Sequence, residues 1–146
     1  MYSAALRLHH LGFVTKSIRE SSSFFLKLGY ELQFDLFYDD YRGIEIQFMK
    51  YPGSNLLIEL ISPKIEKVKD VKNTEAVELT DSLNKMIKSR PGLYHMGYEL
   101  ISDDFHPQDL GLRKISVKAP AIALNNREVE FYLHIDGSIV EVIFPE

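Results

Sequence analysis

The sequence predicts an α+β fold built from two copies of one β-α-β-β-β unit, because two phrases of the chain occur twice. The phrase Leu8 to Phe13 (LHHLGF) returns as Leu93 to Tyr98 (LYHMGY), and Leu57 to Pro63 (LIELISP) returns as Ile139 to Pro145 (IVEVIFP). Each copy therefore carries one His and one Glu at matching places, in stretches whose alternation is typical of strands. Internal repetition of this kind indicates a fold assembled from duplicated units.

The first copy is expected to open with a strand over 6–15 and to continue with a helix from Ser17. Ser17 and Glu20 form a capping box, and Gly29 stands where a helix end takes a left-handed residue. The apolar face of this helix is expected to hold Ile18, Phe24, Phe25 and Leu28. Strands are expected next at 30–37, 43–49 and 55–61, with a turn at 51–54.

The second copy follows a connector whose composition is different. Residues 64–72 are charged and mixed in sign, and 74–89 is expected to be a helix with Leu79, Leu83, Met86 and Ile87 as its apolar stripe. A strand is expected at 93–100, and then a helix at 104–112 that Pro107 and Gly111 should keep short. The remaining expected strands lie at 115–118, 121–124, 129–134 and 138–144, and Asp136-Gly137 forms the turn between the last two. We expect a single domain over 1–146, with modules at 5–63 and 92–146 joined by a helical linker at 64–91.

Composition excludes several classes of function. The chain has 146 residues, a formal net charge of -4 and scattered basic residues, which argues against nucleic acid as a partner. It has no Cys, so disulfides and thiolate metal sites are excluded, and it has no apolar run long enough to span a bilayer. The start of the chain lacks the pattern of a secretory signal, so the cytoplasm is the expected location.

The repeated His and Glu residues are the candidate site. His10, Glu59, His95 and Glu141 each stand in the middle of an expected strand with apolar neighbours. An ionised Glu in such a place is unfavourable unless it is paired or bound to a cation. Two imidazoles and two carboxylates suit a divalent ion such as Zn, Ni, Co, Mn or Fe(II), and leave two positions of an octahedral ion for substrate oxygens. His9 is expected to face away from His10 and to be structural.

Four segments in order resemble the vicinal oxygen chelate superfamily, which includes glyoxalase I, methylmalonyl-CoA epimerase, extradiol dioxygenases and bleomycin-resistance proteins. They are His10 to Val14 with the following helix and Lys27 to Tyr30, then Ile58 to Pro63, Gly92 to Glu99, and Asp136 to Glu141. The resemblance implies curved sheets of two βαβββ modules around a metal-centred cavity. It also implies His10, Glu59, His95 and Glu141 as the metal ligands.

Among these relatives the chain looks most similar to methylmalonyl-CoA epimerases. Some of them carry a base Glu on the strand before the second ligand, and Glu45 in Gly43 to Ile46 sits at a comparable place. Epimerases often have Gln where this chain has Glu59, and the helix of the second copy is short, so the chain departs from the family pattern at these points.

The resemblance implies a metal-dependent isomerase or epimerase that removes a proton next to a carbonyl. A bound metal stabilises an enolate, and a carboxylate, Glu45 or Glu141, acts as the base. One alternative is a glyoxalase I-type lyase, but glyoxalase I uses an Arg on its first strand to bind glutathione, and this chain has no Arg in Gly12 to Thr15. Another is an extradiol dioxygenase, which needs only two His and one carboxylate, so a fourth ligand at Glu59 argues against it. A metal-free small-molecule (drug) binding protein is the non-enzymatic alternative. The expected partners are an acyl-CoA or other carbonyl substrate and a second copy of the chain in a homodimer, with no nucleic acid and no membrane.

Overall fold

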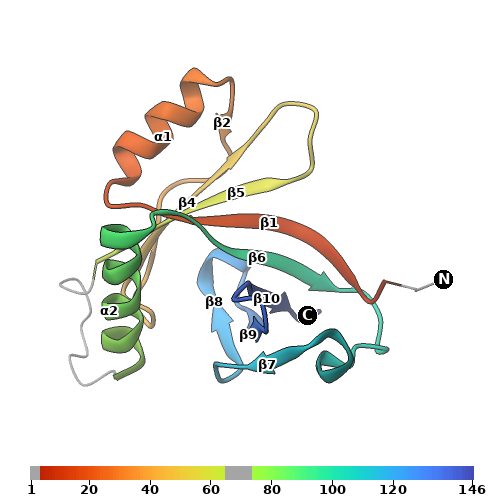
Figure 1. Ribbon diagram of the computed structural model, residues 1–146. Helices are drawn as coiled ribbons and strands as arrows, with labels where there is room; N and C mark the ends of the chain where they lie inside the picture. Colours follow the sequence, from red (N-terminus) through yellow and green to blue (C-terminus); the bar gives the residue numbers. More distant parts are fainter. Residues whose placement is uncertain (1–3, 65–73) are drawn as a thin grey trace. The chain divides into compact units, whose positions relative to one another are not determined.

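The computed structural model describes residues 4–64 and 74–146 (Figure 1). The chain divides into two compact units. Among the described residues, one unit comprises 4–11 and 95–146, and the other comprises 12–64 and 74–94. The charged part of the predicted linker, 65–73, lies outside the described residues. The architecture is α+β, as the sequence predicted, and the described residues contain the α-helices α1 (Ile18–Lys27) and α2 (Thr74–Ser89).

Strands dominate the unit of residues 4–11 and 95–146. The hydrogen-bonded order is β1 (Leu6–Val14, through its first residues), β6 (Gly92–Leu100, from His95), β10 (Ile139–Ile143), β9 (Arg127–His134) and β7 (Leu112–Lys114). The edge strand β8 (Ala119–Ala121) also pairs with β9. β10 runs parallel to β6 and antiparallel to β9. A parallel pair needs a long connection, which here carries the helix of the second copy.

That helix is a single 3-10 turn. It spans Pro107–Leu110 (η2) and ends at Gly111, whose φ of 68° is left-handed. The prediction of a shortened helix is therefore confirmed. Two predicted strands in the same copy are wrong in their placement. Residues 115–118 lie outside β7, and 121–124 is mostly a second 3-10 turn, Ile122–Leu124 (η3), because a short apolar run is compatible with either structure.

In the unit of residues 12–94, α1 packs against β4 (Ile44–Lys50) and β5 (Leu57–Pro63). The Ser17 side chain accepts a hydrogen bond from the Glu20 amide, as the capping box predicts. At the other end Gly29 has a φ of 99°, and the Tyr30 amide donates back to the Phe25 carbonyl, which is a Schellman motif. The Phe13 ring lies against that of Phe25 with centroids 6.1 Å apart, so β1 does pack under the helix.

Two expectations for this unit are wrong. The predicted strand over 30–37 is two short strands, β2 (Glu31–Leu32) and β3 (Phe37–Asp39), both paired with β4. The ladder is interrupted because the segment between Leu32 and Phe37 is longer than the stretch of β4 that it faces, Met49 to Ile46. Within this segment the Phe34 carbonyl accepts a hydrogen bond from the Gln47 side-chain amide, at 2.6 Å. The predicted apolar face of α1 is only partly buried: Ile18 is in the core, but Phe24 and Leu28 are exposed.

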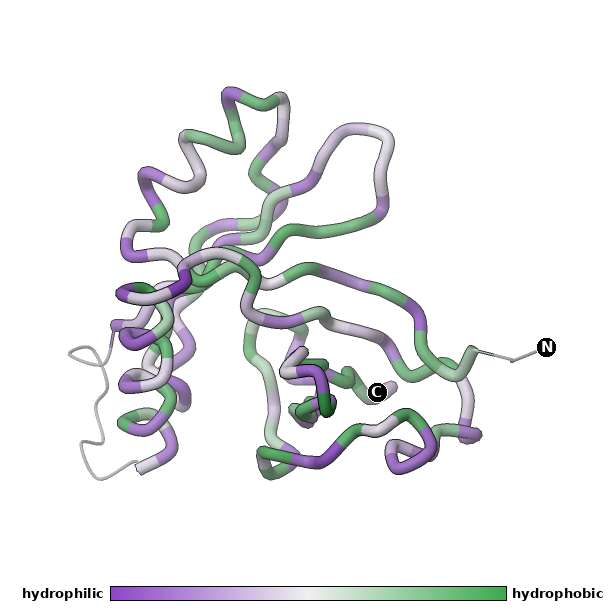
Figure 2. The backbone as a smooth tube through the Cα atoms, in the orientation of Figure 1, coloured by the Kyte–Doolittle hydropathy of each residue, from purple (hydrophilic) through white to green (hydrophobic). Residues whose placement is uncertain are grey.

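The helix α2 has the predicted bounds, and Figure 2 shows it alternating between hydrophobic and hydrophilic residues. Leu83 of the predicted stripe is fully buried, and so is Ala76, which lies two turns earlier on the same face of the helix. The helix packs against β5. Among the described residues, no helix is both long and apolar enough to cross a membrane.

Candidate metal centre

Three strands of the unit of residues 4–11 and 95–146, called the first unit below, bring His10, His95 and Glu141 together. Their side chains are almost fully buried, with 0%, 2% and 5% of each residue exposed. Glu141 on β10 is the register partner of Gly97 on β6, and alternate residues of a strand share a face. Glu141 therefore lies on the same face as His95, two residues before Gly97, and the neighbouring strand β1 supplies His10.

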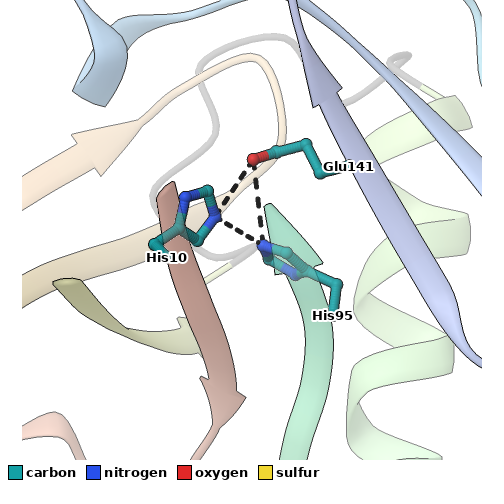
Figure 3. A group of neighbouring side chains, drawn as sticks. All are labelled: His10, His95 and Glu141. Carbon is teal, nitrogen blue, oxygen red and sulfur yellow. Dashed lines mark hydrogen bonds and ion pairs between the residues drawn. The ribbon is translucent and has the colours of Figure 1, made fainter. Parts of the chain in front are cut away.

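The ligand atoms of these three residues point at one another (Figure 3). The Nε2 atoms of His10 and His95 are 2.9 Å apart. The Glu141 Oε1 atom lies 3.1 Å from Nε2 of His10 and 3.9 Å from Nε2 of His95. One carboxylate oxygen and two imidazole nitrogens thus converge from β10, β1 and β6 on one small volume.

This arrangement fits a divalent cation. Ligand atoms about 2.1 Å from a metal lie about 3 Å apart at right angles and about 4.2 Å apart when opposite. The three distances, 2.9, 3.1 and 3.9 Å, fall within that range. Nitrogen and carboxylate donors suit Zn and the neighbouring transition metals, and do not choose among them. His10, His95 and Glu141 therefore form a group that could hold a metal ion.

Gly97 makes room for the His10 ring. A Cβ atom added at Gly97 would lie 2.1 Å from Cε1 of His10 and 2.5 Å from its Nε2, closer than any side chain allows. The sequence contained a signal for this, because both copies of the repeat have Gly two residues after the candidate His, at Gly12 and Gly97. This role of Gly97 is not among the predictions made from the sequence.

His9 is in contact with His10, contrary to the sequence-based expectation that it faces away. The two Nδ1 atoms are 2.9 Å apart, and the rings meet edge to face with centroids 5.1 Å apart. Burial and the neighbouring His10 lower the pKa of His9, which favours its neutral form, while the carboxylates of Glu99 and Glu141 act in the opposite direction. On the other side of the group, the Phe131 ring lies edge to face against His95, with centroids 5.5 Å apart.

An ion-pair network lies on the same unit. Glu99 accepts hydrogen bonds from Arg7, at 2.6 Å, and from Arg127, at 2.9 Å. The hydrogen bond from Arg7 and, to a smaller extent, the one from Arg127 lower the pKa of the Glu99 carboxyl, which is therefore ionised at neutral pH. The Arg127 Nε group also donates to the Phe144 carbonyl, so this residue ties β9 to the end of the chain. Its position opposite Glu99 depends on strand pairing, and the sequence alone contained no signal for it.

Glu59 and Glu45 belong to the unit of residues 12–94. Both are buried, Glu59 on β5 and Glu45 on the adjacent antiparallel strand β4. The register pairs Phe48 with Glu59 and Glu45 with Ser62. Since paired residues share a face and neighbours alternate, Glu59 and Glu45 lie on opposite faces of this strand pair. The roles predicted for them, fourth ligand and base, stay predictions.

A family model described as the Glyoxalase/Bleomycin resistance protein/Dioxygenase superfamily matches residues 9–131. No curated protein sequence matches the chain.

Solved structures share the fold. A methylmalonyl-CoA epimerase from Mycobacterium tuberculosis is 21% identical with a TM-score of 0.70, and the match covers 100% of this chain and 93% of that one. A hypothetical protein from Bacillus halodurans is 20% identical with a TM-score of 0.71, covering 98% and 96%. A Streptomyces coelicolor methylmalonyl-CoA epimerase in complex with 2-nitronate-propionyl-CoA is 15% identical with a TM-score of 0.67, covering 97% and 98%.

At these identities the similarity concerns the fold alone, and it agrees with the glyoxalase-like fold that the resemblance implied. The family model covers most of the chain, including His10 and His95. The chain belongs to the Glyoxalase/Bleomycin resistance protein/Dioxygenase superfamily.

Proposed function

We propose that this protein is a divalent-metal-dependent epimerase or isomerase that removes and returns a proton next to the carbonyl of an acyl-CoA or a related compound. The observation that carries the proposal is the convergence of the His10, His95 and Glu141 ligand atoms within one buried group. The fold similarity to methylmalonyl-CoA epimerases supports the choice of reaction over the lyase and dioxygenase alternatives. One such epimerase is described in complex with methylmalonyl-CoA, which supports acyl-CoA as the substrate class.

The proposed metal ligands are His10, His95 and Glu141, with Glu59 as the fourth. A bound divalent ion would act as a Lewis acid that stabilises negative charge on substrate oxygens. The buried imidazoles bind through neutral nitrogens, and Glu141 supplies the negative charge that a buried cation requires.

A carboxylate of the chain is the proposed base. It takes the proton from the α-carbon, and the C–H electron pair moves toward the carbonyl oxygen to give an enolate. A proton from water then adds to the opposite face and re-forms the C–H bond with inverted configuration, and the carboxylate releases its own proton to water, so no oxidant or second organic substrate is needed. The two candidates are Glu45 and Glu141. Glu45 and Glu59 lie on opposite faces of the β4-β5 pair, so Glu45 can be the base only if Glu59 is not the fourth ligand. With Glu59 as a ligand, Glu141 would have to combine the roles of ligand and base.

The first experiment measures metal binding. Metal-free protein is titrated calorimetrically with Co²⁺, Ni²⁺, Mn²⁺ and Zn²⁺, and compared with His95→Ala and Glu141→Gln. The matched control is His106→Ala, which removes an exposed imidazole on η2's N-terminal side that pairs with Asp104. We expect binding to wild type and His106→Ala, and strong loss in the two site variants. A wild-type protein with no affinity for any divalent ion would support the metal-free binder instead.

The second experiment tests the reaction. Metal-loaded protein is mixed with methylmalonyl-CoA in D₂O, and loss of the α-proton signal is followed by NMR. We expect metal-dependent exchange, which Glu45→Gln abolishes without loss of metal if Glu45 is the base. Unchanged exchange in Glu45→Gln would assign the base role to Glu141. Absence of exchange with methylmalonyl-CoA and with other acyl-CoA thioesters would contradict the proposed reaction.

The proposed assembly is a homodimer, and the proposed location is the cytoplasm. Light scattering of the purified protein tests the first, and a molar mass close to the 16.9 kDa of one chain would contradict it.

A further inference from the structure

We propose that His9 is a positioning residue: its Nδ1 atom accepts the Nδ1–H of His10 and thereby keeps the Nε2 lone pair of His10 directed at His95 and Glu141. The inference rests on the proposed function, because it assumes that His10 binds metal through Nε2. It adds a role for a neighbouring residue that contributes no ligand atom.

The first step is the contact itself. The Nδ1 atoms of His9 and His10 are 2.9 Å apart, a hydrogen-bond distance. Two ring nitrogens at this distance need one proton between them, because two lone pairs repel and two N–H groups collide. One of these two imidazoles therefore donates and the other accepts.

The second step decides which ring donates. Nε2 of His10 lies 2.9 Å from Nε2 of His95 and 3.1 Å from Oε1 of Glu141, so it is the nitrogen that belongs to the ligand group. A nitrogen bound to a metal carries no proton, and a neutral imidazole then carries its single proton on the other nitrogen. Without a metal, the rule of the first step places one proton between the Nε2 atoms of His10 and His95, and in this proposal His95 supplies it. His10 thus donates from Nδ1, and His9 accepts at Nδ1 and keeps its own proton on Nε2.

The third step concerns orientation. Metal-binding histidines commonly donate their second N–H to a carboxylate, a carbonyl or water, which fixes the tautomer and the ring angle. Here the adjacent residue on the same strand takes that place, with its ring at 89° to that of His10. The close approach to Gly97 restrains another side of the His10 ring. The His10 ring is therefore held by its neighbours before a metal ion binds, which is the condition for a preorganised site.

Histidine tautomers in the metal-free protein test the proposal directly. With ¹⁵N-labelled histidine, we expect NMR to find His10 of the wild type with its proton on Nδ1. In His9→Phe the acceptor is lost, so the proton should move to Nε2, where Glu141 Oε1 can accept it. In His9→Asn the side-chain oxygen stands close to the place of Nδ1, and the wild-type tautomer should return. His106→Phe is the matched control and should leave the tautomer of His10 unchanged.

Metal affinity supplies the second readout. Loss of an outer partner of a metal-binding His typically weakens binding about 10- to 100-fold, so His9→Phe should bind Co²⁺ less tightly by about that factor, and His9→Asn should recover most of the loss. A wild-type His10 with its proton on Nε2 would overturn the proposal. So would equal tautomers and equal affinities in wild type and His9→Phe.

The failure of this proposal can be told apart from failure of the proposed function. If His95→Ala abolishes metal binding while His9→Phe does not affect it, the metal site stands and the role of His9 is wrong. If His95→Ala and Glu141→Gln bind metal as the wild type does, the proposed function fails. The tautomer of His10 in the metal-free variants then still shows whether His9 orients it.

Discussion

The two compact units bury their carboxylates in different surroundings. In the unit of residues 4–11 and 95–146, Glu141 meets the imidazoles of His10 and His95. In the unit of residues 12–94, Glu59 and Glu45 are buried on neighbouring strands but on opposite faces of the pair. A group of ligands in one place therefore forms in the first unit, and two separate acidic positions form in the second.

This difference shows how a sequence repeat relates to a site. Each copy of the repeat contributes one His and one Glu. The group in the first unit holds both of these residues from the second copy, His95 and Glu141, but only the His, His10, from the first copy. The unit that holds His95 and Glu141 from the second copy takes only the first part of β1 from the first copy, and that part carries His10. Of the four repeated His and Glu residues, Glu59 is the one that lies outside this unit. The question that follows is how much Glu59 contributes to metal binding.

The largest expected effect comes from removing one carboxylate at a time. If the free energy of binding is shared among four ligands, Glu141→Ala and Glu59→Ala should each weaken Co²⁺ binding about 100-fold or more. Glu59→Gln should weaken it less, because an amide oxygen can still bind the ion. Titration calorimetry with a competing chelator measures all three. Equal affinities of Glu59→Ala and wild type would mean that the first unit alone holds the metal, which would sharpen the contrast between the units.

The next prediction concerns the packing that makes the His10 position possible. Gly97→Ala places a Cβ atom against the His10 ring, so it should lower the free energy of unfolding by about 2–3 kcal/mol. In a His10→Ala background the same substitution should have a much smaller effect, because the ring is absent. Urea unfolding of the four proteins of this double-mutant cycle gives the coupling energy. An equal effect in both backgrounds would mean that the ring does not limit the space at Gly97.

A third prediction tests a buried acid of the first unit that lies outside the ligand group. Glu130 is buried and accepts a hydrogen bond from the Tyr132 hydroxyl at 2.6 Å. Burial, and to a smaller extent this hydrogen bond, raise the pKa of Tyr132. Tyr132→Phe removes the donor and leaves the buried carboxylate less well satisfied, so it should lower the free energy of unfolding by about 1–2 kcal/mol. Metal affinity should stay as in wild type.

Tyr98→Phe is the matched control for that variant. Its hydroxyl contacts only a weak acceptor in the described residues, the Met96 sulfur at 4.0 Å, so the same change of residue should have little effect there. If both variants lose the same stability, the bond to Glu130 contributes nothing specific. Both substitutions can be followed by urea unfolding at neutral pH.

Much of the fold could be predicted because its signals are local. The capping box of α1, the bounds of α2 and the short 3-10 turn at Pro107–Leu110 depend on residues within a few positions of one another. The break in the predicted strand over 30–37 could not be predicted, because it follows from the register of this segment against β4, which is set by residues far along the chain.

The same distinction applies to the site. His10, His95 and Glu141 could be chosen because the repeat marks them. The faces of Glu45 and Glu59 could not, because they follow from the register of β4 with β5. The contact of His9 with His10 was missed because neighbours on an ideal strand point to opposite faces, and the way these two rings turn toward each other has no trace in the sequence.

The smallest expected effect comes from Glu99, the acid of the first unit that is paired with cations. Its folded-state pKa lies below the usual 4.5 because Arg7 and Arg127 donate hydrogen bonds to the carboxylate. A depressed pKa contributes stability that is present above the unfolded-state value and is lost as the pH falls through the folded-state value. Glu99→Gln should therefore lower the free energy of unfolding at pH 7, and this difference from wild type should shrink below pH 4.5.

The size of that effect is limited by solvent. The Arg7 side chain is 66% exposed, so water and salt screen its pair with Glu99, and most of the stabilisation should come from the better buried Arg127. We expect about 1 kcal/mol for Glu99→Gln at pH 7, a larger loss for Arg127→Ala than for Arg7→Ala, and a smaller effect in 1 M salt. Urea unfolding of the three variants at pH 7 and pH 3 measures these differences. A difference between Glu99→Gln and wild type that stays constant between the two pH values would mean that the charge of Glu99 does not stabilise this unit, and that its role is packing.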